Sequence, residues 1–302
     1  MRLLVVPYGE AGNRIDQVLA RLIPEHSRNR LQGWIREGRL TVDGELVTDP
    51  KRKMRGLERL ELTESAPEEV VAQAAEAIPL DIVFEDPDIL VINKPAGLVV
   101  HPGSGNWSGT LLNALLHHAE DARTLARAGI VHRLDKDTSG LMVVARNELA
   151  QTDLVRQLQA RTVKRQYFAL VRGVVARDLH VDEPIGRHPT QRTRMAVVGS
   201  GREARTQVQV RERFARCSLV ECSLETGRTH QIRVHMAHLG HPLVGDTLYG
   251  GSRGEPAFGR QALHAWRLGL IHPRTGEAMA WESPLPADMA GLISALRAAG
   301  PQ

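Results

Sequence analysis

Cysteine and aromatic residues are scarce in this chain. Its 302 residues include two cysteines, and Phe, Trp and Tyr together make up 4%. Cys217 and Cys222 are five positions apart on an expected strand, so they point to opposite faces and cannot pair within it or form a CxxC metal pair. This usage argues against a disulfide-rich secreted domain and fits a reducing cytoplasm, where we expect the protein.

Long apolar runs are also absent. No stretch approaches the roughly 20 residues of a membrane helix, and the first eight residues lack the basic and apolar segments of a secretory signal. We therefore expect no membrane association. Charge of one sign is not in large excess, because 39 Lys and Arg face 35 Asp and Glu. The net charge of +4 permits a polyanionic partner without requiring one, so local clustering carries more information.

A polar segment, 132–139, lies between two apolar, strand-like runs, and we expect Gly140 to mark a turn. Asp135 is the leading candidate for a reactive group at a strand end, because a carboxylate can act as nucleophile or general base. The alternative is a hairpin with ordinary turn residues. That alternative explains the end of the segment, but not His132, Arg133 and Asp135 so close to the apolar run.

The first organised unit is expected over residues 13–65. Apolar residues at helical spacing predict a helix over 15–23, ended by proline, and a second helix after the N-cap Ser27. A strand over 39–42 and an Asp-Gly turn follow. Basic side chains gather on the second helix and after the turn: Arg28, Arg30, Arg36, Lys51, Arg52 and Lys53.

This module resembles the S4 RNA-binding domain, whose paired helices present basic side chains to folded RNA. We therefore interpret the basic residues as RNA contacts. The alternative is an ordinary solvated helix face, which is the usual environment of charged residues.

Residues 66–79 have the composition of a linker, and 80–302 form the expected second domain. Short apolar runs predict strands at 82–84, 89–92, 130–131, 141–145, 167–171, 219–224 and 268–271. Helical spacing predicts helices at 111–118, 150–160 and 230–239. Strands and helices without strict alternation indicate an α+β fold with a mixed, largely antiparallel sheet and flanking helices.

Three motifs in this domain resemble those of the RluA-type pseudouridine synthases. They are the segments 132–140 (His-Arg-Leu-Asp-x-x-Thr-Ser-Gly), 163–169 and 224–235. Segments 93–103, 241–246 and 261–265 agree with a branch of the family that acts on large-subunit ribosomal RNA. Several long motifs in the right order make chance similarity a poor explanation.

The resemblance implies the pseudouridine synthase fold and the isomerisation of uridine to pseudouridine without cofactor or metal. It implies Asp135 as nucleophile and Arg233 as the basic partner of the aspartate. It implies Tyr167 as an active-site residue that helps to deprotonate C5 while its ring stacks on the uracil. The implied substrate is 23S ribosomal RNA, with uridines of the helix 69 stem-loop as targets. Another ribosomal site or transfer RNA stays open as an alternative, and we expect a monomer.

Further RNA contacts are expected near the reacting nucleotide. In relatives, the arginine matching Arg133 enters the RNA helix when the target base is flipped out, and His132 adjoins it. Arg187, Arg192 and Arg194 lie in a segment interrupted by proline and glycine, which predicts a hairpin with a basic tip. An exposed loop kept soluble by its charge is the alternative.

Two functions of other classes compete. Four histidines, His230, His235, His238 and His241, suggest a zinc hydrolase, but the glutamate of an HExxH motif is missing and their spacing puts them on different helix faces. The second rival is a ribosome assembly factor that only binds RNA. Loss of pseudouridine with retained RNA affinity in an Asp135→Asn variant would exclude it as the sole activity.

Overall fold

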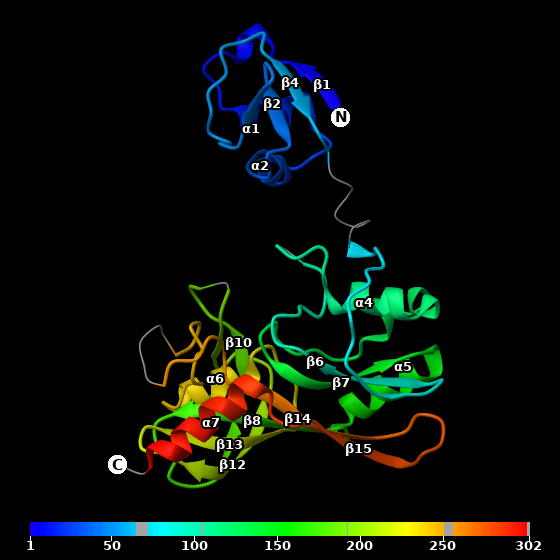
Figure 1. Ribbon diagram of the computed structural model, residues 1–302, viewed down its shortest axis with the longest axis vertical. Helices are drawn as coiled ribbons and strands as arrows, with labels where there is room; N and C mark the ends of the chain where they lie inside the picture. The colour runs from blue at the N-terminus through cyan, green and yellow to red at the C-terminus, as the bar shows by residue number, and fades with distance from the viewer. Residues whose placement is uncertain (65–71, 104, 192, 251–255, 301–302) are drawn as a thin grey trace. The chain divides into compact units, whose positions relative to one another are not determined.

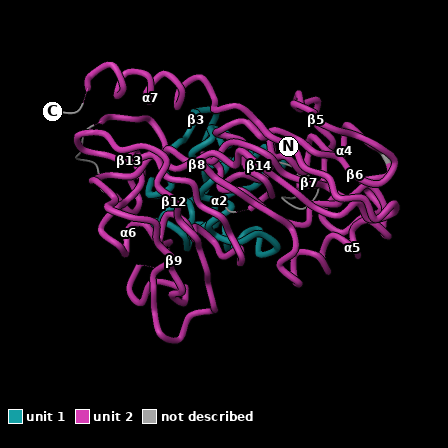
Figure 2. Tube along the Cα trace, turned by 90° about the horizontal axis from the view of Figure 1, so that it is seen from below, with its two compact units in different colours: residues 1–71 teal, residues 72–302 magenta. Residues whose placement is uncertain are grey.

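The computed structural model describes residues 1–64, 72–103, 105–191, 193–250 and 256–300. The chain forms two compact units, Met1–Val71 and Ala72–Gln302, which are coloured teal and magenta in Figure 2. Residues 66–71 of the expected linker lie outside the described residues. Residues 72–79 belong to the second unit, where the Glu76 carboxylate accepts from the backbone N–H of Gly109 at 3.0 Å.

The first unit is a four-stranded antiparallel sheet with two helices (Figure 1). Its elements are β1 (Arg2–Val5), α1 (Ile15–Leu22), α2 (Arg28–Arg36), β2 (Leu40–Val42), β3 (Glu45–Val47) and β4 (Arg59–Leu62), with the 3-10 helix η1 (Tyr8–Glu10) after β1. The sheet order is β1-β4-β2-β3. The expected N-cap is confirmed, since the Ser27 hydroxyl accepts from the Arg30 N–H at 3.3 Å.

The sequence prediction for this unit missed its first strand. β1 begins eleven residues before the expected boundary at residue 13 and pairs with β4 over its whole length. Leu3 and Val5 are exposed on it, and its pattern is too short to separate from a loop by periodicity. Pairing with a strand more than 50 residues later therefore defines β1.

The second unit is built on a nine-stranded sheet with the order β5-β6-β7-β14-β8-β13-β12-β9, with β15 pairing β14. The strands are β5 (Ile82–Glu85), β6 (Ile89–Lys94), β7 (Ser139–Ala145), β8 (Lys164–Arg172), β9 (Leu179–Asp182), β12 (Arg205–Arg213), β13 (Cys217–Leu224), β14 (Leu263–Ile271) and β15 (Ala278–Glu282). β7 and β14 are parallel, and the other pairs are antiparallel. The expected mixed, largely antiparallel α+β fold is confirmed.

Helices cover both faces of this sheet. They are α4 (Leu111–His118), α5 (Glu148–Gln159), α6 (Gln231–His238) and α7 (Ala287–Ala299), with the short 3-10 helices η2 (Glu120–Thr124) and η3 (Ala126–Gly129) after α4. α4 and α6 pack on one face in the largest apolar cluster, and α5 and α7 pack on the other face in two further clusters. Cys222 belongs to the first face and Cys217 to the second, and both thiols are free, as their spacing predicted.

The polar segment before β7 differs from its prediction in two ways. Residues 130–131 form no strand, and Ile130 makes a single bridge to Val144. Gly140 is not the turn but lies within β7, with φ +117°, and a Cβ there would stand 2.2 Å from the Ala265 carbonyl oxygen. The close approach of β14, far away in sequence, therefore requires this glycine.

The basic segment forms the expected hairpin. β10 (Ile185–Arg187) and β11 (Met195–Val197) make a separate two-stranded antiparallel sheet. Arg192 lies outside the described residues. In the part of the chain that the structure describes, none of the helices combines the length and apolarity needed to cross a membrane.

Candidate active site

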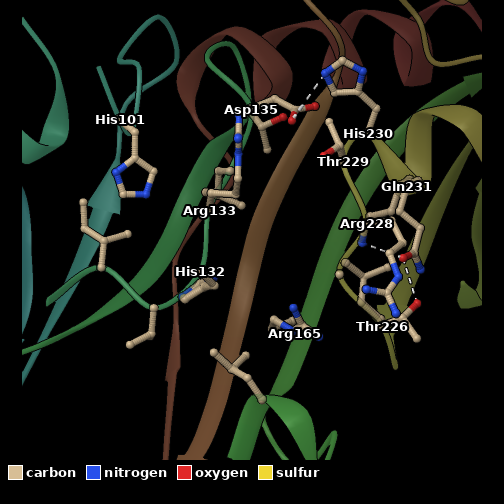
Figure 3. A pocket seen from close by; sticks show the side chains of 18 of the residues that line it. His101, His132, Arg133, Asp135, Arg165, Thr226, Arg228, Thr229, His230 and Gln231 are labelled. Atoms are coloured by element: carbon tan, nitrogen blue, oxygen red, sulfur yellow. Dashed lines mark hydrogen bonds and ion pairs between the residues drawn. The ribbon is translucent and has the colours of Figure 1, made fainter. Parts of the chain in front are cut away.

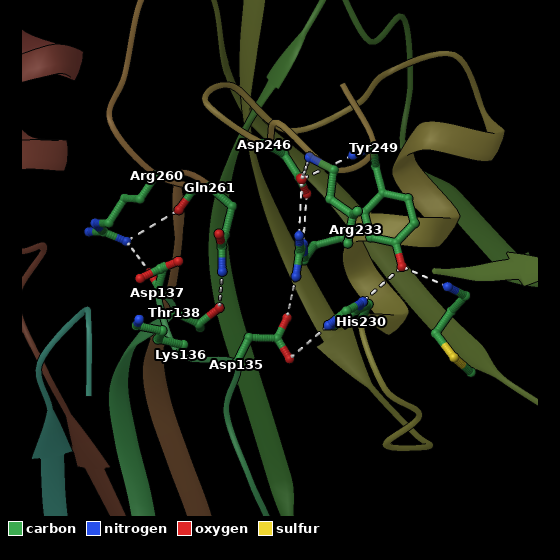
Figure 4. Close-up of polar contacts among 12 residues, drawn as sticks. Asp135, Lys136, Asp137, Thr138, His230, Arg233, Asp246, Tyr249, Arg260 and Gln261 are labelled. Carbon is green, nitrogen blue, oxygen red and sulfur yellow. Dashed lines mark hydrogen bonds and ion pairs between the residues drawn. The ribbon is translucent and has the colours of Figure 1, made fainter. Parts of the chain in front are cut away.

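Asp135 lies in the loop that enters β7 and faces a buried guanidinium. Its Oδ2 accepts from Nη1 of Arg233 at 2.9 Å, and its Oδ1 lies 3.8 Å from Nε2 of His230 (Figure 4). The carboxylate is 17% exposed, so it is neutralised from one side and accessible from the other. The expected pair of Asp135 and Arg233 is thus formed across 98 residues of sequence.

A second carboxylate holds Arg233 in place. Asp246 accepts from Nε at 2.7 Å and from Nη2 at 3.0 Å, leaving Nη1 for Asp135. Burial alone would lower the pKa of Arg233, but the hydrogen bonds and charges of the two aspartates raise it above its usual value. The guanidinium carbon also lies 5.0 Å from the ring centre of Tyr249. Arg233 therefore has one orientation, set by a bidentate pair and an aromatic face.

Asp246 ends the motif 241–246, and the sequence alone assigns it no role. It is 1% exposed and accepts from the backbone N–H groups of Leu248 and Tyr249 at 3.0 and 3.1 Å. The Tyr249 hydroxyl hydrogen-bonds Nδ1 of His230 at 2.8 Å and accepts from the Met195 N–H. Asp246, Tyr249 and His230 thus form one hydrogen-bonded group beside Arg233, which no local sequence pattern indicates.

The turn after Asp135 is held by three side chains from other parts of the second unit. The Lys94 ammonium donates to three carbonyl oxygens, one of them that of Lys136 at 2.9 Å. Arg260 donates to the Asp137 carbonyl at 3.0 Å, and Gln261 to the Thr138 hydroxyl at 3.3 Å. Lys94 is 1% exposed, and burial lowers its pKa to about 8. These bonds fix the backbone that carries the Asp135 carboxylate.

Tyr167 and Asp135 line the same cavity, which has a volume of about 1020 Å³. Tyr167 lies on β8 on the face covered by α6 and is 5% exposed. Burial raises the pKa of its phenol above the usual value, so the side chain enters any reaction protonated. The structure therefore brings together the three residues that the motifs singled out.

The cavity is strongly basic. Seven arginines line it against two acids, Asp135 and Glu225. The arginines are Arg127, Arg133, Arg161, Arg165, Arg202, Arg228 and Arg233. Figure 3 shows Arg133, Arg165 and Arg228 around the same space as Asp135 and His101. A cleft of this size and charge suits an anionic ligand larger than a single base.

Arg133 and His132 differ in their surroundings. Arg133 is exposed on the cavity rim and has no ion pair or hydrogen bond among the described residues. His132 accepts from the Val143 N–H through Nε2 at 3.0 Å. Burial and the charge of Arg165 lower its pKa to about 3. An RNA contact by His132 would thus involve the neutral ring.

This arrangement predicts a pH effect on stability. Because the folded pKa of His132 lies below that of an unfolded histidine, about 6.5, the unfolded chain binds more protons between these values. The contribution of His132 to the free energy of unfolding is therefore full above about pH 6.5 and falls as the pH falls toward 3. In a His132→Gln variant, urea unfolding at about pH 7 and about pH 4.5 should differ less than in the wild type. Equal differences would contradict the assignment.

The other expected RNA contacts have mixed surroundings. Arg28 is bound to the fully buried carboxylate of Asp16 at 2.8 Å, and Arg52 pairs with Glu45 at 3.0 Å. Arg194 lies 5.3 Å from the ring centre of Tyr249 and donates to Gln191. Arg30 is half-buried, and its guanidinium carbon lies 5.0 Å from the ring centre of Trp34. The remaining four are exposed: Arg36, Lys51 and Lys53 in the first unit and Arg187 on the hairpin.

The four histidines do not converge on a common point. Both ring nitrogens of His235 are used, by the Thr206 hydroxyl and the Glu183 carbonyl, while His241 bonds the Arg172 carbonyl. Among the described residues, the group with metal-ligand spacing is Asp86, Asp88 and His272, where Arg274 already binds Asp88 through two bonds. These histidines therefore form no joint ligand set.

Comparison with known proteins agrees with this site. Residues 88–238 match the family model described as RNA pseudouridylate synthase, and residues 13–56 match the S4 domain. The chain is 56% identical over 301 residues to "Ribosomal large subunit pseudouridine synthase D" of Nitrosomonas europaea, which covers 97% of this chain and 87% of the relative. It is 53% identical to the protein of that name from Pseudomonas aeruginosa, covering 98% and 96%.

A solved structure supports the fold of the second unit. "Human RNA Pseudouridylate Synthase Domain Containing 1" superposes with a TM-score of 0.56 and 30% sequence identity. The match covers 76% of this chain and 98% of the human one. The resemblance therefore extends from the motifs to the arrangement of the elements that carry them.

Proposed function

Since this chain belongs to the RNA pseudouridine synthases and carries an S4 domain, we propose that it isomerises uridines of large-subunit ribosomal RNA. The relatives named above are large-subunit enzymes, which supports this substrate class. Within that RNA we propose the helix 69 stem-loop as the target.

The observation that carries the proposal is the carboxylate of Asp135, held by Arg233 at the edge of a basic cavity. The reaction breaks the bond between N1 and C1′, turns the base and joins C5 to C1′, while the C5 proton is lost and N1 gains one. It needs a carboxylate that reaches the nucleotide and a site that limits access of water. Asp135 supplies the first, and the buried Tyr167, which lines the same cavity, lies against the base.

Access to a paired or stacked uridine requires that the base leave the helix. Unstacking costs a few kcal/mol, which contacts to the backbone must offset. We propose that the exposed Arg133 occupies the space vacated by the base, with His132 beside it as a neutral contact. The hairpin arginines Arg187 and Arg194, together with the basic residues of the S4 unit, bind phosphates and position the RNA.

The test is tritium release from large-subunit RNA labelled at C5 of uridine, as naked RNA and in ribosomal particles. The proposal expects release of tritium in proportion to pseudouridine formed, followed by mapping of the modified positions. Pseudouridine outside helix 69 would correct the target but keep the chemistry. Absence of release from every large-subunit RNA would overturn the proposed reaction and substrate together.

Two basic residues of the S4 unit should behave differently when replaced by alanine. Arg28→Ala removes a partner of the buried Asp16, so we expect a loss of about 1 to 2 kcal/mol in unfolding free energy, moderated by the exposure of Arg28. Lys53 forms no ion pair among the described residues. Lys53→Ala should leave stability unchanged and reduce the slope of log affinity against log salt by about 1. Urea unfolding and RNA binding over a salt series measure both, and the reverse ranking would contradict the assignment.

A further inference from the structure

Arg165 is a buried arginine with no acidic partner in the described part of the chain. It lies on β8, two residues before Tyr167 and on the same face, and is 8% exposed. Its Nε is buried without a hydrogen bond, and no bond or ion pair of its other nitrogens joins it to a described residue. Since a guanidinium remains protonated, this is a buried charge that the protein alone leaves uncompensated.

The side chain faces the cavity that contains Asp135. Both residues line it, and Figure 3 shows the guanidinium of Arg165 and the carboxylate of Asp135 at separate places in the same space. The guanidinium lies against Gly227, where an added Cβ would stand 2.7 Å from Nη1. The two acids of the cavity are bound elsewhere, because Asp135 pairs with Arg233 and Glu225 lies 3.8 Å from Arg205. The free charge of Arg165 is therefore available to an incoming anion.

The spacing along β8 indicates which anion fits. The Cα atoms of residues two apart on a strand are separated by about 6.6 Å, so the side chains of Arg165 and Tyr167 leave β8 as neighbours on one face. In a nucleotide, one sugar separates the base from its flanking phosphates. A base packed near Tyr167 and Asp135 thus brings a phosphodiester toward Arg165, and a guanidinium binds phosphate oxygens with two parallel hydrogen bonds.

We propose that Arg165 binds the phosphodiester that flanks the target uridine, holding the flipped nucleotide with its sugar at Asp135. This inference rests on the proposed function. It assigns Arg165 to the phosphodiester beside the flipped uridine. Arg133, by contrast, is proposed to fill the space that the base has left in the RNA helix. The contact forms only with a flipped nucleotide, so it favours the reactive complex over unspecific RNA binding.

The test uses a short RNA that contains the mapped uridine, with an uncharged methylphosphonate replacing the phosphodiester on either side in turn. For one of the two linkages, the wild type should lose about 10- to 100-fold in RNA affinity and in kcat/KM, the range for a hydrogen bond to a charged group. Arg165→Met should show a similar loss on the native RNA and less than about threefold further loss with the neutral linkage. Arg165→Lys, which keeps the charge, should recover part of the loss.

Two further variants separate this contact from a structural role. Gly227→Ala keeps the residue Arg165 but pushes its guanidinium away from its present position. The neutral linkage should then cost this variant less affinity and less kcat/KM than it costs the wild type. Arg297→Met removes a charge that lies on α7 and pairs with Glu212, and this variant should keep the full response. Thermal unfolding should show that each variant is folded.

The outcomes are distinguishable. If the wild type is active but Arg165→Met and the neutral linkage reduce affinity independently, their combined loss equals the product of the single losses. That result would overturn the phosphate contact and leave the isomerase function standing. The same holds if neither linkage affects the wild type. If the wild type releases no tritium from any RNA, the proposed function fails and this inference fails with it.

Discussion

Replacing Asp135 by asparagine should abolish pseudouridine formation, with a loss of about 10⁴-fold or more in kcat/KM. Asparagine has nearly the same shape, and its amide oxygen can still accept from Nη1 of Arg233, so the fold and the cavity should be retained. What is lost is the negative charge and the nucleophilic oxygen. Tritium release measures the activity, and filter binding of the same RNA should show an affinity within about threefold of the wild type.

Asp137 supplies a matched control for this variant. It belongs to the same motif and turn, but its side chain does not line the cavity, and its carbonyl is the group that Arg260 binds. Asp137→Asn should therefore keep activity within about tenfold, the scale of one neutral hydrogen bond. Equal losses for both variants, or activity retained in Asp135→Asn, would contradict the assignment of Asp135 as the reactive carboxylate.

Replacing Asp246 by alanine should have the largest effect on stability. The variant leaves the buried Arg233 with one acidic partner instead of two and removes the acceptor of two backbone N–H groups. Breaking a buried charged pair from one side costs about 3 to 5 kcal/mol in unfolding free energy. Because the guanidinium also loses its orientation beside Asp135, we expect kcat to fall by about 100-fold.

Asp246→Asn separates the two contributions. The amide keeps one oxygen as acceptor for the backbone N–H groups but offers Arg233 no charge. The unfolding free energy of this variant should therefore lie between that of the wild type and that of Asp246→Ala. Urea unfolding and tritium release at saturating RNA measure stability and kcat. An alanine variant with wild-type stability and activity would show that Asp246 is dispensable for holding Arg233.

The local elements were predictable because their signals are local. The second helix of the S4 unit begins after Ser27 as its capping pattern predicts, and α4 spans Leu111–His118 as its apolar spacing predicts. β1 and the turn before β7 were not predictable, because residues distant in sequence define them. Gly140 is the clearest case: its role as a strand glycine exists only because β14 passes beside it.

The candidate site divides in the same way. Asp135, Tyr167 and Arg233 stand in motifs whose residue types suggest chemistry, and the fold gathers them at one cavity. The support around them carried no comparable signal. In the sequence, Lys94 and Arg165 look like ordinary surface charges. Only the structure shows that both side chains are buried.

By itself, the amino-acid sequence indicated the two-domain organisation of helices and strands, the family motifs and Asp135 as the candidate carboxylate, because periodicity, capping and motif spacing are properties of neighbouring residues. The tertiary structure decided which charges meet. Asp246 orients Arg233 toward an aspartate 98 residues away, and Arg28 is taken up by a buried carboxylate in its own unit. Electrostatic interactions depend on distance and burial, which arise only when strands far apart in the chain pair into one sheet.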